Sequence, residues 1–179
     1  MPTLISRKIA VTALMALLAI SAFALNSRKD APKFRAKSIS GEQFNNESLK
    51  GKPVLIQFWA TWCRYCRRDE PVLEDLGKEF AGKLTILTVD IGESKRKVQD
   101  YLAKNPRSFP VVLTGDTNLG AVMEATAYPK YVLLDEDGKM AGEQTGSGGE
   151  ASLRHLLKEV SLVGKAPDAD FVLEGSPAK

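Results

Sequence analysis

Residues 59–66 read WATWCRYC and decide the fold class of this chain, because they contain both of its cysteines, Cys63 and Cys66. They follow an almost uninterrupted apolar run, Val54–Trp59, which is typical of a strand covered on both faces. A helical pattern with Pro71 inside it comes next. Two thiols at i and i+3 at the start of a helix lie close enough to form a disulfide, and the unpaired N–H groups there favour a thiolate on the first. The segment therefore predicts a redox-active pair.

Other uses of the two cysteines are less consistent with their spacing. A structural disulfide is the alternative in an oxidising compartment, but so short a ring restricts little of the unfolded chain and adds little stability. Two inert core cysteines are a further alternative, which the flanking residues disfavour. A structural zinc site needs four nitrogen or sulfur ligands, whereas the only histidine, His155, is distant in sequence. We therefore expect no metal and no cofactor besides the redox-active disulfide Cys63–Cys66.

Length and composition indicate one globular domain with an appendage. The 179 residues are 44% apolar and 26% charged, which is ample for a hydrophobic core. The formal net charge of +3 is small, and no dense basic block accompanies it. We therefore expect no nucleic-acid partner. We also expect the protein to be a monomer.

The N-terminal segment differs from the rest. Two basic residues, Arg7 and Lys8, precede the uncharged span Ile9–Ser27, and Ala22–Ala24 fits a signal-peptidase site. The span is just long enough to cross a bilayer if it is not cut, so residues 1–25 are either a signal peptide or an N-terminal membrane anchor. In both cases the basic side stays in the cytoplasm and the domain is exported. A buried helix of the domain is the third possibility.

The remaining pattern alternates short strands and helices. We expect strands over 34–39 and 42–44, joined as a hairpin, and over 54–59, 84–90, 131–134 and 140–144. We expect helices over 63–80, 95–104, 118–124 and 150–162. The run 109–113 leads to a turn and is not assigned as a strand, so the order is β-β-β-α-β-α-α-β-β-α. This order predicts an α/β domain with a mixed sheet flanked by helices, between a linker at 26–33 and a flexible tail at 164–179.

Several short motifs accompany the cysteine pair: GKPVL at 51–55, FWATWC at 58–63, Asp69, Pro71, Phe109-Pro110, Tyr128-Pro129 and LDEDG at 134–138. With these residues, the chain from about Ala31 to Val163 resembles the thioredoxin superfamily, and within it the exported TlpA/ResA-like thiol–disulfide oxidoreductases. The resemblance implies a thioredoxin fold over 34–163, with an added N-terminal β-hairpin and a central insertion near Ile91–Pro110.

The resemblance also implies roles for individual residues. Cys63, which we expect to be partly exposed, attacks a partner disulfide, and the more buried Cys66 resolves the mixed disulfide. Pro129 is expected to be a cis-proline facing the cysteines, so that the backbone of Tyr128 pairs with an extended partner segment. A trans-proline at the first residue of a strand is the alternative. Thioredoxin has a buried carboxylate where this chain has Gln57, so the group that assists Cys66 is unassigned.

The residues that flank the pair are expected to tune it and to bind partners. Trp62 is expected to lie against the disulfide in a docking surface. Arg64 either stabilises the Cys63 thiolate, which makes the disulfide more oxidising, or is a solvated side chain with little effect. Tyr65 either contacts a partner or covers the disulfide. Asp69 and Glu70 are three and four residues after Cys66, so either carboxylate could approach its thiol. We expect both to be solvated instead, because acidic residues are rarely buried.

Together these features predict an extracytoplasmic enzyme, periplasmic or on the outer face of the cytoplasmic membrane. It would reduce disulfides of exported proteins through Cys63 and Cys66, for example apocytochrome c before haem attachment. Its electrons would come from a membrane thiol carrier, and an uncut N-terminal segment would hold it at the membrane. The alternatives are a disulfide-forming oxidase or isomerase, and a redox-sensing or metallochaperone binding module.

Overall fold

The computed structural model describes residues 28–162. The expected signal or anchor at 1–25 and the expected tail at 164–179 therefore lie outside the described residues. Within residues 28–162, no helix combines the length and the hydropathy needed to span a bilayer.

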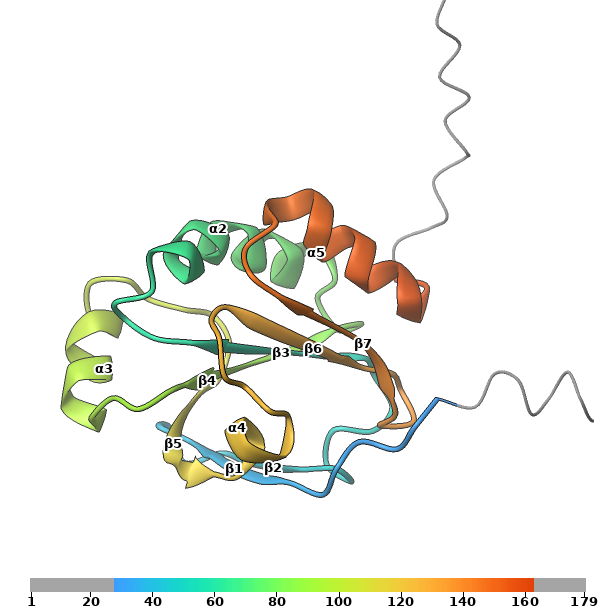
Figure 1. The fold of residues 1–179 in the computed structure, drawn as a ribbon, viewed down its shortest axis with the longest axis horizontal. Coiled ribbons are helices and arrows are strands. Elements are labelled where there is room, and N and C mark those ends of the chain that lie inside the picture. The colour runs from blue at the N-terminus through green and yellow to red at the C-terminus, as the bar shows by residue number, and fades with distance from the viewer. Residues whose placement is uncertain (1–27, 163–179) are drawn as a thin grey trace, which may run out of the picture.

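The described part of the chain forms seven strands and a set of helices (Figure 1). The strands are β1 (Arg35–Ser38), β2 (Gln43–Asn45), β3 (Val54–Trp59), β4 (Thr85–Asp90), β5 (Val111–Thr117), β6 (Lys130–Leu134) and β7 (Met140–Thr145). The helices are α2 (Arg64–Glu79), α3 (Lys95–Leu102), α4 (Leu119–Val122), α5 (Gly149–Leu157) and the 3-10 helix η1 (Lys158–Val160).

All seven strands belong to one mixed sheet with the order β2-β1-β5-β4-β3-β6-β7. β3 is parallel to β4 and β4 to β5, whereas β6 pairs antiparallel with β3 and β7 with β6. All six residues of β3 are buried, as the apolar run predicted. The mixed sheet flanked by helices and the N-terminal hairpin are therefore confirmed.

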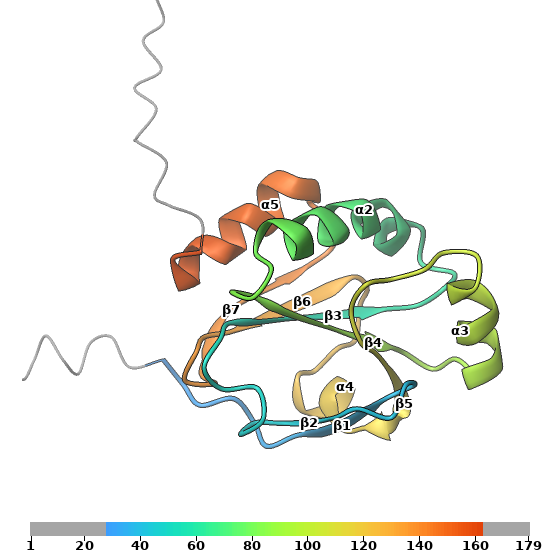
Figure 2. The same cartoon turned by 180° about the vertical axis from the view of Figure 1, so that it is seen from behind.

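Helices cover both faces of this sheet (Figure 2). α2 and α5 pack side by side on one face, where Leu55 of β3 contacts Leu73 and Leu153 in a single apolar cluster. α4 lies on the other face, where its Leu119 shares an apolar cluster with the next residue of β3, Ile56. Ala36 and Phe44, of the β1–β2 hairpin at the edge of the sheet, belong to the same cluster. Successive side chains of a strand point to opposite faces, which is why neighbouring residues of β3 belong to different halves of the core.

The strand β5 corrects the element order expected from the sequence. Val111–Thr117 forms a strand that pairs parallel with β4 and antiparallel with β1. Its second half is largely exposed, and its pairing with β1 contains an irregularity between Ala36 and Ser38. The Gly115-Asp116 dipeptide therefore lies within a strand and not in a turn, between Val112 and Thr117, which pair with Ser38 and Ala36 of β1.

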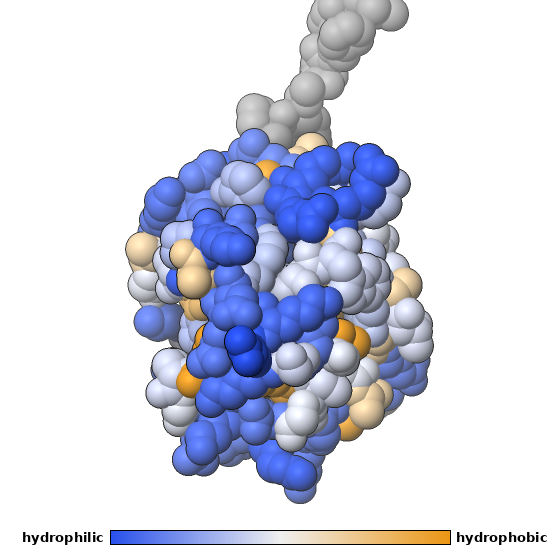
Figure 3. Space-filling view, turned by 90° about the vertical axis from the view of Figure 1, so that its left-hand side faces the viewer, coloured by the Kyte–Doolittle hydropathy of each residue, from blue (hydrophilic) through white to orange (hydrophobic). Residues whose placement is uncertain are grey.

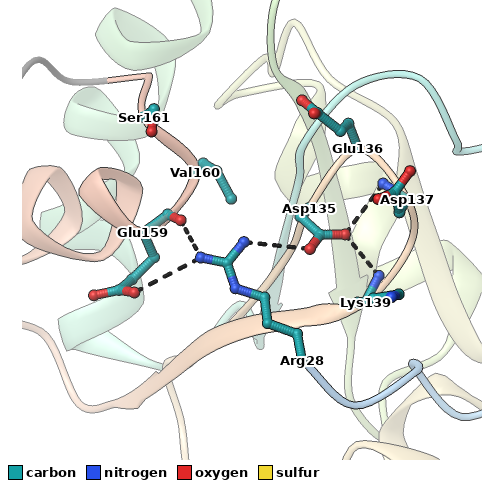
Figure 4. A pocket seen from close by; sticks show the side chains of 8 residues that line it. All are labelled: Arg28, Asp135, Glu136, Asp137, Lys139, Glu159, Val160 and Ser161. Carbon is teal, nitrogen blue, oxygen red and sulfur yellow. Dashed lines mark hydrogen bonds and ion pairs between the residues drawn. The ribbon is translucent and has the colours of Figure 1, made fainter. Parts of the chain in front are cut away.

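The β6–β7 turn lies at the end of the sheet that is opposite to the end of β3 at Trp59, since β6 runs antiparallel to β3. A pocket of about 400 Å³ opens there, as Figure 4 shows. Arg28 joins its two sides, because its guanidinium bonds the carboxylate of Asp135 at 3.2 Å and the backbone oxygen of Glu159. Residues 28–31 of the expected linker thus pack on the domain, with Ala31 buried and Asp30 bridged to Lys139.

Candidate active site

The two cysteines lie at the junction between β3 and α2. Cys63 is the N-cap residue of α2, and its Sγ accepts a hydrogen bond from the backbone N–H of Cys66 at 3.2 Å. The two residues form a disulfide, with their Cα atoms 5.3 Å apart. This geometry follows from the sequence: β3 ends at Trp59, a turn delivers Cys63 to the helix start, and Cys66 is one helical turn further on.

The two cysteines differ slightly in exposure, but both are buried in the domain. Cys63 is 4% exposed and Cys66 is fully buried, among apolar side chains that include Trp59 and Val98. Cys66 is therefore the more buried of the two, as expected. Cys63 is less exposed than we expected for the attacking residue.

An arginine lies on each side of Tyr65 at the surface of the helix start. The guanidinium carbons of Arg64 and Arg68 lie 5.1 Å and 5.4 Å from the centre of the Tyr65 ring. Tyr65 is one of two large aromatic side chains that are strongly exposed in the described part of the chain. About half of its surface is therefore open to a partner.

Trp62 is the other exposed aromatic residue, with 60% of its surface accessible. Its ring lies edge-on to that of Tyr128, with the ring centres 6.2 Å apart. The Tyr128–Pro129 peptide bond is cis, as the resemblance implied, and Pro129 is buried. Trp62 and Tyr128 thus bring together the segment before Cys63 and the segment before β6.

The expectation that Asp69 and Glu70 are solvated is wrong. Asp69 is fully buried, and its carboxylate accepts hydrogen bonds from the hydroxyls of Tyr131, at 2.9 Å, and Ser147. The phenol of Tyr131 in turn accepts from the side-chain amide of Gln57 at 3.2 Å. Asp69, Tyr131 and Gln57 thus each have a hydrogen-bond partner, and such partners allow the carboxylate of Asp69 to be buried on the inner face of α2.

The carboxylate of Glu70 is held by an arginine that the sequence had not marked as functional. Arg107, in the segment before β5, bonds Glu70 at 2.9 Å and the side-chain oxygen of Gln57 at 3.3 Å. Tyr101 of α3 donates its hydroxyl to the other oxygen of Glu70 at 3.0 Å. Nothing in the local sequence of Arg107 distinguishes it from a surface arginine, because Glu70 and Gln57 are 37 and 50 positions away along the chain.

A second pair of carboxylates lies beneath the turn that precedes Cys63. Glu93 accepts hydrogen bonds from the backbone N–H and hydroxyl of Thr61 and pairs with Lys97 at 2.6 Å. Burial and the neighbouring Glu93 raise the pKa of Asp90 to about 7. Burial alone would also raise the pKa of Glu93, but its bonds to Lys97 and Thr61 outweigh that effect and lower it to about 2. Polar residues at the carboxyl end of a central strand were the available sequence signal for this pair.

The described residues show no group of three or more histidine, cysteine, aspartate or glutamate side chains arranged to hold a metal ion. The pocket at the β6–β7 turn contains no residue of the 59–66 segment.

Known proteins match most of this chain. The model of the AhpC/TSA family matches residues 28–142. The thioredoxin-like protein YneN of Bacillus subtilis is 34% identical over 66% of this chain and 71% of its own. The thiol-disulfide oxidoreductase ResA of the same organism is 30% identical over 74% and 75%.

The fold is also found in solved structures. A thiol:disulfide interchange protein of the thioredoxin family from Chlorobium tepidum superimposes with a TM-score of 0.66 and 24% identity, over 75% of this chain and 97% of its own. The fold, the matching family model and the disulfide at the start of α2 agree with one another. The chain accordingly belongs to the AhpC/TSA family, as a thioredoxin-like thiol–disulfide oxidoreductase.

Proposed function

We propose that this protein reduces disulfides of exported proteins outside the cytoplasm, with Cys63 as the attacking residue. The observation that carries the proposal is the N–H of Cys66 directed at the Sγ of Cys63, at the N-terminus of a 16-residue helix. Unpaired N–H groups and the helix dipole stabilise a thiolate there. The first turn of α2 contains no acidic residue that would oppose this effect.

The reaction proceeds in two exchange steps. The Cys63 thiolate attacks one sulfur of the partner disulfide, forms a mixed disulfide, and releases the other partner sulfur as a thiolate. Cys66 then loses its proton and attacks the sulfur of Cys63, which releases the partner fully reduced. Two electrons pass to the partner, and a membrane dithiol carrier has to return two electrons to the Cys63–Cys66 disulfide.

Asp69 is the group we assign to the deprotonation of Cys66. The two residues are three positions apart on α2, so they share a helix face, and both are fully buried. Gln57 accepts no proton, whereas the carboxylate of Asp69 does. The hydroxyls of Tyr131 and Ser147 hold that carboxylate in place.

The extracytoplasmic location rests on the basic and then uncharged N-terminal segment and on the relatives named ResA. In that location the substrates are disulfides of other exported proteins. Apocytochrome c before haem attachment is the example that the resemblance favours, because its two haem-binding cysteines have to be reduced.

A disulfide-forming oxidase is the second candidate. Arg64 follows Cys63 directly and is exposed, and a cation beside a thiolate stabilises the reduced form. Stabilising the reduced form makes the disulfide a stronger oxidant. The geometry is the same for both candidates, and only the position of the redox equilibrium separates them.

The deciding experiment is the equilibrium reduction potential of the Cys63–Cys66 pair, measured by titrating the full-length chain in detergent with thiol redox buffers. A value near or below about −270 mV supports the reductase. A value near about −120 mV means an oxidase and overturns the proposed direction. A chain that never turns over a disulfide substrate in the presence of a dithiol donor is a binding module and not an enzyme.

A further inference from the structure

Three exposed arginines lie at the start of the helix that carries the cysteine pair. Arg64, Arg67 and Arg68 lie within the first five positions of α2, and all three are exposed. Arg67 donates a hydrogen bond to the backbone oxygen of Thr61 at 3.0 Å, so it lies over the turn that leads to Cys63. Within residues 28–162, none of the three forms an ion pair with a carboxylate.

The carboxylates of the adjoining segments do not neutralise these arginines at the surface. Asp69 is fully buried, and Glu70 is bonded to Arg107. Glu93 is bonded to Thr61 with its side chain 4% exposed. The positive end of the α2 dipole adds to the charge of the arginines. Figure 3 views this end of the molecule, and hydrophilic residues cover most of it.

The arginines are partly preorganised. The guanidinium of Arg68 bonds the hydroxyl of Ser147 at 2.8 Å, and the rings and guanidinium groups of Arg64, Tyr65 and Arg68 are in contact. A side chain already held in place loses less rotamer entropy when it binds a ligand. A planar guanidinium pairs with a carboxylate through two parallel hydrogen bonds.

We propose that this arginine cluster (Arg64, Arg67 and Arg68) docks acidic segments of partner proteins, so that the enzyme prefers disulfides flanked by aspartate or glutamate. This inference rests on the proposed exchange reaction and names its substrate class. The occupant is an extended protein segment that carries carboxylates beside its cysteine. The exposed ring of Trp62 supplies an apolar contact on the other side of Cys63.

The geometry of α2 sets the distance between the attacked cysteine of the partner and the carboxylates that the arginines bind. Arg68 is five residues after Cys63, which is about 7.5 Å along the axis of an α-helix. An extended chain covers that distance in about two to three residues. The preferred substrate therefore has its acidic residues about two or three positions from the cysteine that Cys63 attacks.

The test uses three peptides of one length, each with a single cysteine and supplied as the symmetric disulfide. The positions two and three residues from the cysteine, on both sides, hold Glu, Gln or Lys. The full-length chain in detergent is reduced with dithiothreitol and freed of it. Cys63 then attacks a peptide disulfide and releases one peptide thiol, and Cys66 releases the second as the Cys63–Cys66 disulfide forms. Peptide thiols are counted by chromatography after an acid quench.

We expect the Glu peptide to react at least about fivefold faster than the Gln peptide at about 20 mM salt, and the Lys peptide to be slowest. The preference should fall below about twofold at about 0.5 M salt, because ions screen charges between exposed groups. Arg68→Gln and Arg64→Gln should each lower the Glu-to-Gln rate ratio. That ratio is independent of any effect of Arg64 on the reactivity of the Cys63 thiolate, because such an effect scales all three rates equally.

Arg35→Gln is the matched control, since Arg35 is exposed on β1, which β5 and β4 separate from β3. It should leave the ratio unchanged. Equal rates for the Glu and Gln peptides, or a preference that salt leaves intact, would overturn the docking proposal while the exchange reaction stands. If no peptide yields thiols, the proposed function itself fails.

Discussion

The guanidinium carbon of Arg107 lies 3.6 Å from the centre of the Trp59 indole ring, with the arginine side chain only 1% exposed. Trp59 is the last residue of β3, four positions before Cys63. Arg107 also bonds Gln57 on the same strand and Glu70 on α2. One buried cation therefore connects the strand that leads into the active site with the helix that leaves it.

Removing this cation should destabilise the fold. Arg107→Met retains much of the apolar stem but leaves the carboxylate of Glu70 without its cation, although that side chain is only 13% exposed. We expect the free energy of unfolding to fall by about 3 kcal/mol, as for other broken buried ion pairs. Urea unfolding of the oxidised protein measures this change.

Two further variants separate charge from packing at Arg107. Adding Glu70→Gln to Arg107→Met removes the uncompensated charge and should restore at least about 1 kcal/mol. Arg35→Met, at an exposed position on β1, should change the free energy of unfolding by less than about 0.5 kcal/mol. An Arg107→Met protein as stable as the unchanged chain would contradict this view of the buried cation.

The raised pKa of Asp90 predicts that stability falls as pH rises. Burial is the main cause of the shift to about 7, so between pH 5 and 7 the folded chain holds a proton on Asp90 that the unfolded chain has lost. Glu93 is largely ionised in both states over this range and adds little to the slope. We expect Asp90 to lower the free energy of unfolding by about 2–3 kcal/mol between about pH 5 and about pH 7.5.

Urea unfolding at several pH values checks the assignment to Asp90. Asp90→Asn cannot titrate and should lose this part of the pH dependence. Asp116→Asn, at an exposed position of β5, should keep it. An Asp90→Asn protein with the original pH dependence would show that another group is responsible.

Asp69→Asn should slow the second step of the reaction and leave the first step largely intact. Asparagine has an oxygen that still accepts the hydrogen bond from Tyr131, but it accepts no proton from Cys66. We expect the mixed disulfide to persist at least about 100-fold longer near neutral pH, the lower end of the usual range for loss of a general base. The lifetime is measured by acid quench and gel analysis from about pH 6 to pH 9.

The pH profile distinguishes proton transfer from a structural effect of Asp69. Raising the pH should restore the rate of the Asp69→Asn protein, because hydroxide then deprotonates Cys66. Asp75→Asn changes an exposed carboxylate of the same helix and should behave like the unchanged protein. A lifetime that is long at every pH would indicate a misplaced Cys66 and not a missing base.

Cys66→Ala should trap partners on Cys63. Without the resolving thiol, the mixed disulfide with a substrate protein accumulates, and a reducing gel should release the partner. Cys63→Ser should trap nothing, because Cys66 is fully buried. Stable adducts on the Cys63→Ser protein would mean that the roles of the two cysteines are reversed.

Much of the fold followed from local patterns. The apolar run Val54–Trp59 became a fully buried strand with the same bounds, and the helix expected over 63–80 was found at Arg64–Glu79. Pro71 lies within that helix at an exposed position. The strand β5 was missed because its exposed half is held by pairing with β1, more than seventy residues earlier. A one-dimensional pattern carries little information about such a partner.

The sequence by itself determined the cysteine pair, its place at a strand–helix junction, and the Tyr128–Pro129 segment, because short motifs and apolar periodicity are local properties. Only the tertiary structure decided which polar residues lie beneath the pair. Asp69 is buried because Tyr131 and Ser147, 62 and 78 positions away, satisfy its carboxylate. A charged side chain is buried only where distant elements supply its partners, and those partners meet only after the sheet has formed.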